Sequence, residues 1–229
     1  ADELKLTSDA AYVHITSNET IEGIEFPYDL DAAGIPVICD ASSNILSKPI
    51  NISRYSLIYA GVQKNIGPSG VTVVIISDEM IERVPIKQHR MLDYRLFAKH
   101  DSMPNTPNTW GIYLISLVST WLFEQGGLKS IASRNREKAE CLYNAIDKSD
   151  GFYTGHAAAA ARSRMNVTFR SPAEDLDERF WSEAASHGLD GLKGHRSVGG
   201  IRASIYNAFP MQGVRALTEF MGDFARRNG

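Results

Sequence analysis

The chain is 229 residues long, with 43% hydrophobic and 22% charged residues, an ordinary composition for a globular protein that buries its core without disulfides or metals. Its formal net charge of -3 offers no basic excess for neutralising phosphates, which argues against nucleic acid as the main partner. Cys39 and Cys141 lack zinc-ligand spacing, and we recognise neither a signal peptide nor an apolar stretch of membrane-spanning length, so we expect a cytoplasmic protein.

Short apolar runs separated by turn residues predict a mostly parallel α/β sheet in the first half of the chain. The runs cover residues 11–16, 35–39, 57–62 and 71–76. Several are apolar on both faces, as in a sheet that helices cover on both sides. Most connections are long enough for crossovers, but a short Gly/Pro loop joins the last two runs, which leaves an antiparallel pair open.

The middle of the chain predicts an irregular stretch over residues 85–108, followed by two helices. The first helix starts near Thr109, has one apolar face and ends at the pair Gly126-Gly127. The second covers residues 128–147 and is more polar. The glycine pair is the best candidate for a boundary, so we expect a large-domain part over residues 1–127 and a small domain over 128–229.

The last third predicts a small α+β domain. Residues 164–170 alternate as a half-buried strand, and residues 177–187 have a helical pattern. Two further strands are expected over 189–193 and 201–206. Pro210 opens a final helix that carries apolar side chains on one face.

Lys64 is the first candidate for chemistry. It leaves an apolar run, residues 56–63, and enters a Gly/Pro turn, residues 65–70. Desolvation at such a place lowers the pKa of an amine and makes it a nucleophile toward carbonyls. A single lysine at a strand end is more often a solvated rim residue, so the interpretation depends on its companions.

A carbonyl-reactive lysine needs an electron sink, and pyridoxal phosphate is the commonest one. Asp40 ends a buried strand, at the edge where parallel sheets bind ligands, and would suit the pyridinium nitrogen. Alternatively, Asp40 caps the turn that follows it. Thr20 lies at the corresponding end of the first strand and would bond the ring hydroxyl, although an ordinary loop explains it equally well.

Further polar residues suit the anionic groups of such a cofactor and its substrates. Gln63, Asn105 and Thr106 are neutral donors for phosphate oxygens, unless they serve only turn chemistry. Arg202 interrupts an apolar strand and should pair with an anion, often a carboxylate.

His195 and Arg196 stand beside glycines that permit close approach of another group. They indicate a clamp for a phosphate or carboxylate. A solvated loop is the alternative.

Five segments together resemble the phosphoserine aminotransferase family, in the same order and spacing. They are residues 18–23, 40–43, 59–68, 102–107 and 193–207. The resemblance extends over essentially the whole chain. It implies the α/β fold type I of pyridoxal-phosphate-dependent transferases, class V, with an incomplete large domain and a C-terminal α+β small domain.

The resemblance also implies roles for the cofactor-binding residues. Lys64 would carry pyridoxal 5'-phosphate as a Schiff base and then shuttle protons. Asp40 would hold the pyridinium nitrogen, and Thr20 and Gln63 would contact the cofactor.

The remaining implied roles concern substrates and a second subunit. Asn105 and Thr106 would reach the cofactor phosphate of the neighbouring subunit in a homodimer with shared active sites. Arg202 would bind the substrate α-carboxylate. His195 and Arg196 would bind the substrate phosphate or the distal carboxylate of glutamate.

The implied reaction exchanges an amino group between L-glutamate and 3-phosphohydroxypyruvate, giving O-phospho-L-serine and 2-oxoglutarate, as in serine and pyridoxine biosynthesis. Family members carry a long N-terminal portion before the position of Ala1, so we expect a sheet edge without its neighbour. Two alternatives remain open. One is another class V aminotransferase with a different acidic substrate, and the other is a non-catalytic fragment that serves as a dimerisation module.

Overall fold

The computed structural model describes residues 5–7 and 9–229. Its internal contacts divide the chain into two compact units. The first unit comprises residues 1–17, 28–45 and 50–121, and the second comprises residues 18–27, 46–49 and 122–229. A division into domains at residue 127 stays a prediction, and the contacts add two short early segments to the second unit.

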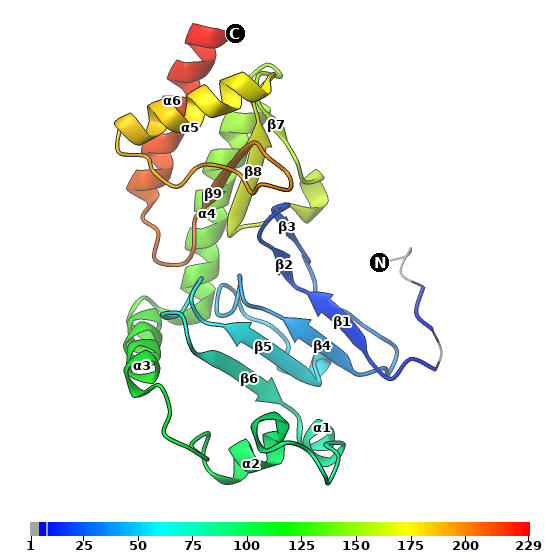
Figure 1. Ribbon diagram of the computed structural model, residues 1–229. Helices are drawn as coiled ribbons and strands as arrows, with labels where there is room; N and C mark the ends of the chain where they lie inside the picture. Colours follow the sequence, from blue (N-terminus) through cyan, green and yellow to red (C-terminus); the bar gives the residue numbers. More distant parts are fainter. Residues whose placement is uncertain (1–4, 8) are drawn as a thin grey trace. The chain divides into compact units, whose positions relative to one another are not determined.

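The first unit is built on a four-stranded sheet with the order β1-β4-β5-β6 (Figure 1). The strands are β1 (Val13–Thr16), β4 (Val37–Asp40), β5 (Leu57–Gly61) and β6 (Thr72–Ile76). The β1–β4 and β4–β5 pairs are parallel, whereas β5 and β6 are antiparallel. The mostly parallel sheet expected from the sequence is therefore confirmed, and β1 forms an edge of it among the described strands.

Helical segments follow the sheet along the chain. They are α1 (Asp78–Glu82), α2 (Tyr94–Lys99) and α3 (Thr109–Glu124), with 3-10 turns at Ile52–Arg54 and Arg90–Leu92. The expectation of a wholly irregular stretch over residues 85–108 was wrong. Asp93 caps α2 by accepting a hydrogen bond from the Arg95 backbone N–H, and this short-range signal starts a helix without an apolar periodicity.

The second unit combines an antiparallel sheet, a hairpin and three long helices. The sheet has the order β7-β8-β9, and β2 pairs with β3 in the hairpin. The strands are β2 (Asn18–Glu19), β3 (Ile24–Glu25), β7 (Thr154–Gly155), β8 (Asn166–Arg170) and β9 (Ile201–Ser204). The helices are α4 (Gly127–Asp147), α5 (Glu174–Ser186) and α6 (Met211–Asn228), with a 3-10 turn at Ala159–Ala161.

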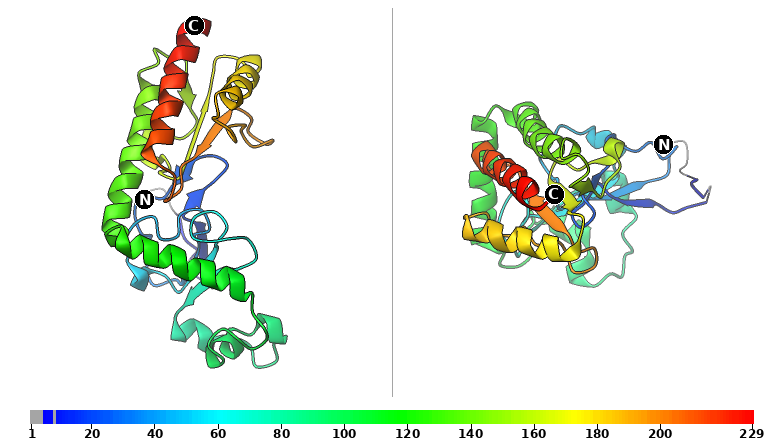
Figure 2. Two further views of the ribbon diagram at one scale, coloured as in Figure 1. Left: turned by 90° about the vertical axis from the view of Figure 1, so that its left-hand side faces the viewer. Right: turned by 90° about the horizontal axis from the view of Figure 1, so that it is seen from above.

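One apolar core holds the second unit together. Helices α4 and α6 lie side by side in both views of Figure 2. Their inward faces meet those of α5, β8 and β9, and the aromatic rings of Phe169, Phe180 and Phe224 are almost fully buried. Phe180 contacts both other rings edge-on, at centroid distances of 5.8 and 5.1 Å. In the described part of the chain, no helix has the length and apolar character needed to cross a membrane.

The strand expected over residues 189–193 does not form. Gly188 and Gly191 have φ angles of +78° and +74°, which belong to turns and not to strands. Only Lys193 makes a single bridge, to Ile201 of β9. The apolar residues in this segment are buried by the core and not by strand pairing.

Lys138 of α4 is a buried cation in the second unit. Its residue is 2% exposed, and its Nζ donates hydrogen bonds to the backbone carbonyls of Ile205 and Tyr206 at 2.9 and 2.6 Å. Burial lowers the pKa of this amine from 10.5 to about 8. The contact ties the segment that follows β9 to the middle of α4.

The Lys138 pKa predicts a pH-dependent stability. The unfolded chain holds a proton on this amine up to about pH 10.5, whereas the folded chain releases it from about pH 8. The unfolded state therefore binds more protons between these values, and this contribution to the free energy of unfolding rises with pH. Relative to Lys138→Met, we expect the wild type to gain on the order of 1–3 kcal/mol between pH 8 and 10 in denaturant titrations. The variant Lys148→Met, at an exposed lysine that follows α4, should show no such trend, and an unchanged or falling difference for Lys138→Met would contradict the prediction.

A tight loop precedes β9. The Gly194 backbone N–H donates to the Gly200 carbonyl at 2.9 Å, and the Gly199 N–H donates to the His195 carbonyl at 2.7 Å. A Cβ at Gly194 would overlap the Gly199 carbonyl oxygen and lie 2.7 Å from that of Gly200. The loop therefore closes only with glycine at position 194.

The substitution Gly194→Ala should open this loop. The clash is with backbone atoms that cannot rotate away, so we expect a loss of about 1–3 kcal/mol in the free energy of unfolding. Gly155→Ala is the matched control, because a Cβ there would meet no atom closer than 3.6 Å. Equal stability of the two variants in urea titrations would contradict this prediction.

Candidate functional site

Lys64 lies in a turn that directly follows β5. The backbone N–H groups of Ile66 and Gly67 both donate to the Val62 carbonyl, at 3.1 and 2.9 Å, and close one helical turn. Val62 and Ile66 are buried, and the Asn65 side chain donates to the Ile45 carbonyl at 2.6 Å. These anchors on both sides fix the half-buried Lys64 at the carboxyl end of β5.

Asp40 is the last residue of β4, the parallel neighbour of β5. Its Oδ1 accepts a hydrogen bond from the Ser42 backbone N–H at 2.8 Å, so it caps the turn that follows the strand. The Ser42 hydroxyl in turn accepts from the Gly61 N–H at 3.0 Å. This bond joins the turn after Asp40 to the end of β5, three residues before Lys64. The structure thus brings both residues to the same edge of the sheet.

The other expected cofactor contacts of the first unit are exposed. Gln63 precedes Lys64, and its side-chain amide folds back against Gly61. Asn105 and Thr106 lie in the segment before α3, where the Asn105 side-chain N–H donates to the Thr106 carbonyl at 3.1 Å. Their side chains are open to a group outside the described residues.

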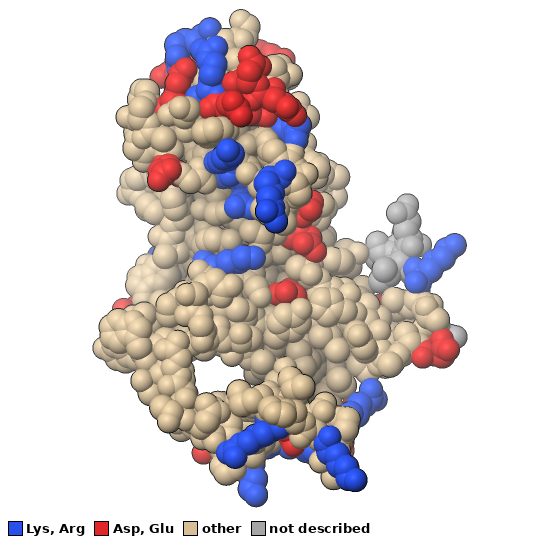
Figure 3. Space-filling view, in the orientation of Figure 1, with Lys and Arg blue, Asp and Glu red and all other residues tan. Residues whose placement is uncertain are grey.

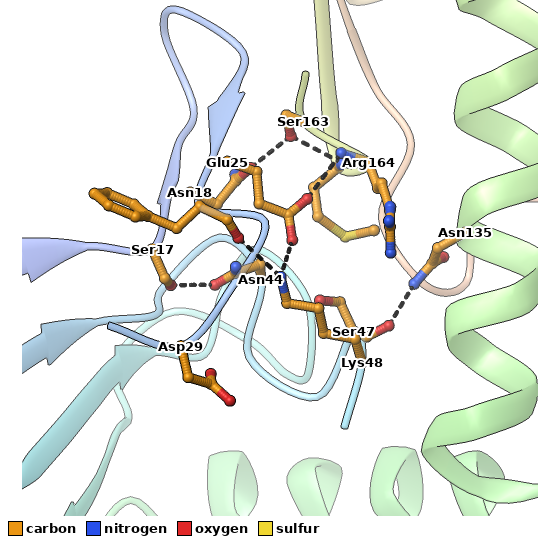
Figure 4. Close-up of polar contacts among 12 residues, drawn as sticks. Ser17, Asn18, Glu25, Asp29, Asn44, Ser47, Lys48, Asn135, Ser163 and Arg164 are labelled. Atoms are coloured by element: carbon orange, nitrogen blue, oxygen red, sulfur yellow. Dashed lines mark hydrogen bonds and ion pairs between the residues drawn. The ribbon is translucent and has the colours of Figure 1, made fainter. Parts of the chain in front are cut away.

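Thr20 belongs to the second unit, in the turn between β2 and β3. The hairpin is held by buried polar contacts (Figure 4). Asn18 donates to the Asn166 side chain at 2.9 Å and accepts from the Ser163 hydroxyl. Glu25, whose side chain is 4% exposed, pairs with Lys48 at 2.7 Å. A buried and fully partnered network of this kind gives the half-buried Thr20 a fixed position within the second unit.

His195 and Arg196 lie in the tight loop before β9. The His195 Nδ1 contacts the Ser197 hydroxyl at 2.7 Å and accepts from its backbone N–H at 3.3 Å. The ring therefore carries its proton on Nε2 when the Ser197 N–H bond forms, and Nε2 is left for another partner. Arg196 beside it is exposed.

Arg202 lies within β9, between the buried residues Ile201 and Ala203. Among the described residues, no carboxylate forms an ion pair with its half-buried guanidinium. Figure 3 shows Lys and Arg side chains gathered over the segment that leads into this strand, which contains Lys193 and Arg196. The arrangement favours an external anion as the partner of Arg202.

No role was assigned from the sequence to three residues near Asp40, namely Ser42, Tyr59 and His14. Ser42 carries the bond to β5 described above. Tyr59 is the register partner of Asp40, and its hydroxyl contacts the His14 Nε2 at 3.0 Å. His14 and Tyr59 both lie in sequence runs that are otherwise apolar and predict strands. A side chain with a polar group in such a run is the sequence feature that could have identified them as candidates.

The first-unit residues have the chemistry that pyridoxal phosphate requires. A carboxylate suits a protonated ring nitrogen, and an amine suits the aldehyde. Asp40 and Lys64 supply these two groups from adjacent strand ends, where open α/β sheets bind ligands. Thr20, His195, Arg196 and Arg202 belong to the second unit, and they carry hydroxyl, imidazole and guanidinium groups.

Comparisons with known proteins agree with this chemistry. The family described as Aminotransferase class-V matches residues 1–217. The chain is 53% identical over 221 residues to phosphoserine aminotransferase of Chromobacterium violaceum, which covers 96% of this chain and 61% of that protein. It is 51% identical over 226 residues to the phosphoserine aminotransferase of Geobacillus kaustophilus, covering 99% and 62%.

Solved structures show the same likeness. Phosphoserine aminotransferase from Bacillus circulans subsp. alkalophilus aligns with a TM-score of 0.97 at 47% identity, covering 100% of this chain and 63% of that one. The PLP-bound phosphoserine aminotransferase from Trichomonas vaginalis aligns with a TM-score of 0.91 at 42% identity, covering 96% and 62%. The chain spans 61–63% of the length of these relatives. Its fold is that of the fold-type I aminotransferases, and the chain belongs to the class-V aminotransferase family.

Proposed function

We propose that this chain provides the lysine-bearing part of a pyridoxal-phosphate-dependent phosphoserine aminotransferase. The observation that carries the proposal is the placement of Asp40 and Lys64 at adjacent ends of the parallel strands β4 and β5. The chain is a class-V family member and is about half identical to phosphoserine aminotransferases. In such a chain, a carboxylate and an amine at these positions would bind the ring nitrogen and the aldehyde of pyridoxal phosphate. The amino group would pass between L-glutamate and 3-phosphohydroxypyruvate, giving O-phospho-L-serine and 2-oxoglutarate.

Each residue would contribute a distinct step of binding or proton transfer. Bound pyridoxal phosphate would supply the electron sink that makes the α-carbon of an amino acid acidic. Lys64 would hold the cofactor at its aldehyde carbon through a primary amine and, when that amine is free, would accept and return a proton at Nζ. Asp40 would keep a proton on the ring nitrogen, and Thr20 and Gln63 would hold the ring and its substituents in place.

The second unit would bind the substrates. The Arg202 fork suits an α-carboxylate held by two parallel hydrogen bonds. His195 and Arg196 would bind the phosphate of one substrate and the distal carboxylate of the other, both of which are anionic. A pocket that accepts two anions needs mobile cationic side chains, and the exposed Arg196 fits that need.

We further propose a cytoplasmic homodimer with shared active sites. Asn105 and Thr106 would reach the cofactor phosphate of the other subunit. They stand just before α3, whose side chains Trp110, Tyr113 and Leu117 are 66%, 53% and 47% exposed, an apolar group suited to a partner. The two cysteines are unpaired, as is usual in a reducing compartment.

Replacing Lys64 tests the covalent role. In the longest natural form of the protein, borohydride treatment should attach the cofactor to the peptide that contains Lys64, and mass spectrometry should locate it there. Lys64→Ala should abolish both this attachment and the visible absorption band of the bound cofactor. The exposed Lys87 gives the matched control Lys87→Ala, which should keep both signals. A band that survives in Lys64→Ala would overturn the assignment.

Replacing Arg202 tests substrate binding. Loss of a desolvated ion pair with two hydrogen bonds costs about 2–5 kcal/mol. Arg202→Ala should therefore raise the half-saturating concentrations of glutamate and of the keto acid alike, by about 30-fold or more. Arg202→Lys should recover only part of the loss, because an ammonium cannot form the paired bonds. Arg215→Ala, at an exposed position on α6, is the control. Unchanged saturation curves for Arg202→Ala would contradict the proposed role.

A further inference from the structure

One face of the first-unit sheet places three polar side chains in a row. Asp40 of β4 is the register partner of Tyr59 on β5 and of Thr16 on β1. His14 lies two residues before Thr16 and therefore projects from the same face of the sheet. The three chemistry-bearing residues His14, Tyr59 and Asp40 thus come from three adjacent strands and share one face.

Their contacts form a chain that ends at Asp40. The His14 Nε2 lies 3.0 Å from the Tyr59 hydroxyl oxygen, and the two rings are tilted by 31° with centroids 6.0 Å apart. The Asp40 carboxylate faces the same hydroxyl. Burial, the negative charge of Asp40 and hydrogen bonding to that carboxylate raise the pKa of Tyr59, so the phenol keeps its proton.

The number of available protons fixes the direction of the hydrogen bonds that run from His14 through Tyr59 to Asp40. A phenol has a single proton to donate, and the carboxylate is the stronger acceptor. When that proton points to Asp40, the Tyr59 oxygen accepts from His14, which must then be protonated on Nε2. Donation by His14 polarises the phenol and strengthens its bond to Asp40.

Asp40 retains capacity for a further donor. A carboxylate has about four lone-pair sites. The Ser42 N–H occupies one of them at Oδ1, and the hydroxyl of Tyr59, the register partner of Asp40, would occupy another. With both bonds made, the carboxylate would be restrained from two sides and still able to accept a hydrogen bond from a ligand.

We propose that His14 and Tyr59 are positioning residues, which hold the Asp40 carboxylate oriented to accept a hydrogen bond from the protonated ring nitrogen of the cofactor. The inference rests on the proposed function and assigns a role to two residues that act on Asp40, Tyr59 directly and His14 through Tyr59, and that do not touch the reacting atoms. Loss of the Tyr59 hydroxyl would free one side of the carboxylate and leave its orientation less restrained.

The test uses the longest natural form of the protein, freed of cofactor and titrated with pyridoxal phosphate. A hydrogen bond to a charged group is worth enough that Tyr59→Phe should raise the dissociation constant by about tenfold, and His14→Leu by about threefold. With cofactor labelled with ¹⁵N in the ring, both variants should also shift the ring-nitrogen NMR signal. His14→Gln, which keeps an N–H donor, should restore the wild-type signal.

Tyr55→Phe is the matched control. The Tyr55 hydroxyl donates to the Asp29 Oδ1 at 2.7 Å, a tyrosine–aspartate bond of the same type in the same unit, which does not involve Asp40. This variant should lose stability without moving the ring-nitrogen signal. A purely structural role for Tyr59 would make the two tyrosine variants behave alike.

The outcomes separate the inference from the function on which it rests. A wild type that binds no pyridoxal phosphate would overturn the proposed function. If the wild type binds pyridoxal phosphate, and Tyr59→Phe and His14→Leu have the same affinity and ring-nitrogen signal as the wild type, only the inference is overturned. If Tyr59→Phe does not fold, His14→Leu decides, because His14 is exposed and does not contact Asp40 in the proposed chain.

Discussion

The parallel pairing of β4 with β5 is the constraint on which the first unit depends. The register sets Asp40 beside Tyr59, and both strands end at the same edge of the sheet. The Ser42 hydroxyl then fixes the turn after Asp40 to the Gly61 N–H, just before the turn of Lys64. A slip of one residue would send Asp40 to the opposite face and separate it from Tyr59. The candidate chemistry therefore depends on backbone pairing before any side chain is considered.

The second unit reaches a comparable rigidity by burying polar groups. Asn135 of α4 donates to the Ser47 carbonyl at 3.1 Å and to the Asn207 side chain at 2.8 Å. Lys138 donates to the carbonyls of Ile205 and Tyr206, the two residues before Asn207. The N–H groups of these two side chains are costly to bury unless they are partnered, so they specify one arrangement of the segment after β9. Arg202 is carried by that strand, and a guanidinium selects carboxylates well only when its backbone is held in place.

Much of the architecture could be predicted because it follows from local patterns. The strands near residues 35–39, 57–62 and 71–76 are apolar on both faces, and the final helix starts at Pro210 with an apolar stripe. The prediction of secondary structure failed where the backbone geometry of a few residues determined whether a strand or helix forms. Positive φ angles at two glycines prevent a strand over 189–193, and a single capping aspartate starts α2. The assignment of residues 18–27 and 46–49 to the second unit depends on long-range contacts, which no local pattern contains.

The two readings of Asp40 that the sequence left open are compatible with each other. The turn-capping role is real, since Oδ1 accepts from the Ser42 N–H. That bond uses one of several lone pairs, so it does not compete with a ligand. It also restrains the rotation of the carboxyl group, and an unrestrained carboxylate would lose side-chain entropy when it bound a ring nitrogen. The structural role of the aspartate thus prepares the chemical role that we propose, which explains why a residue type common in turns stands at this strand end.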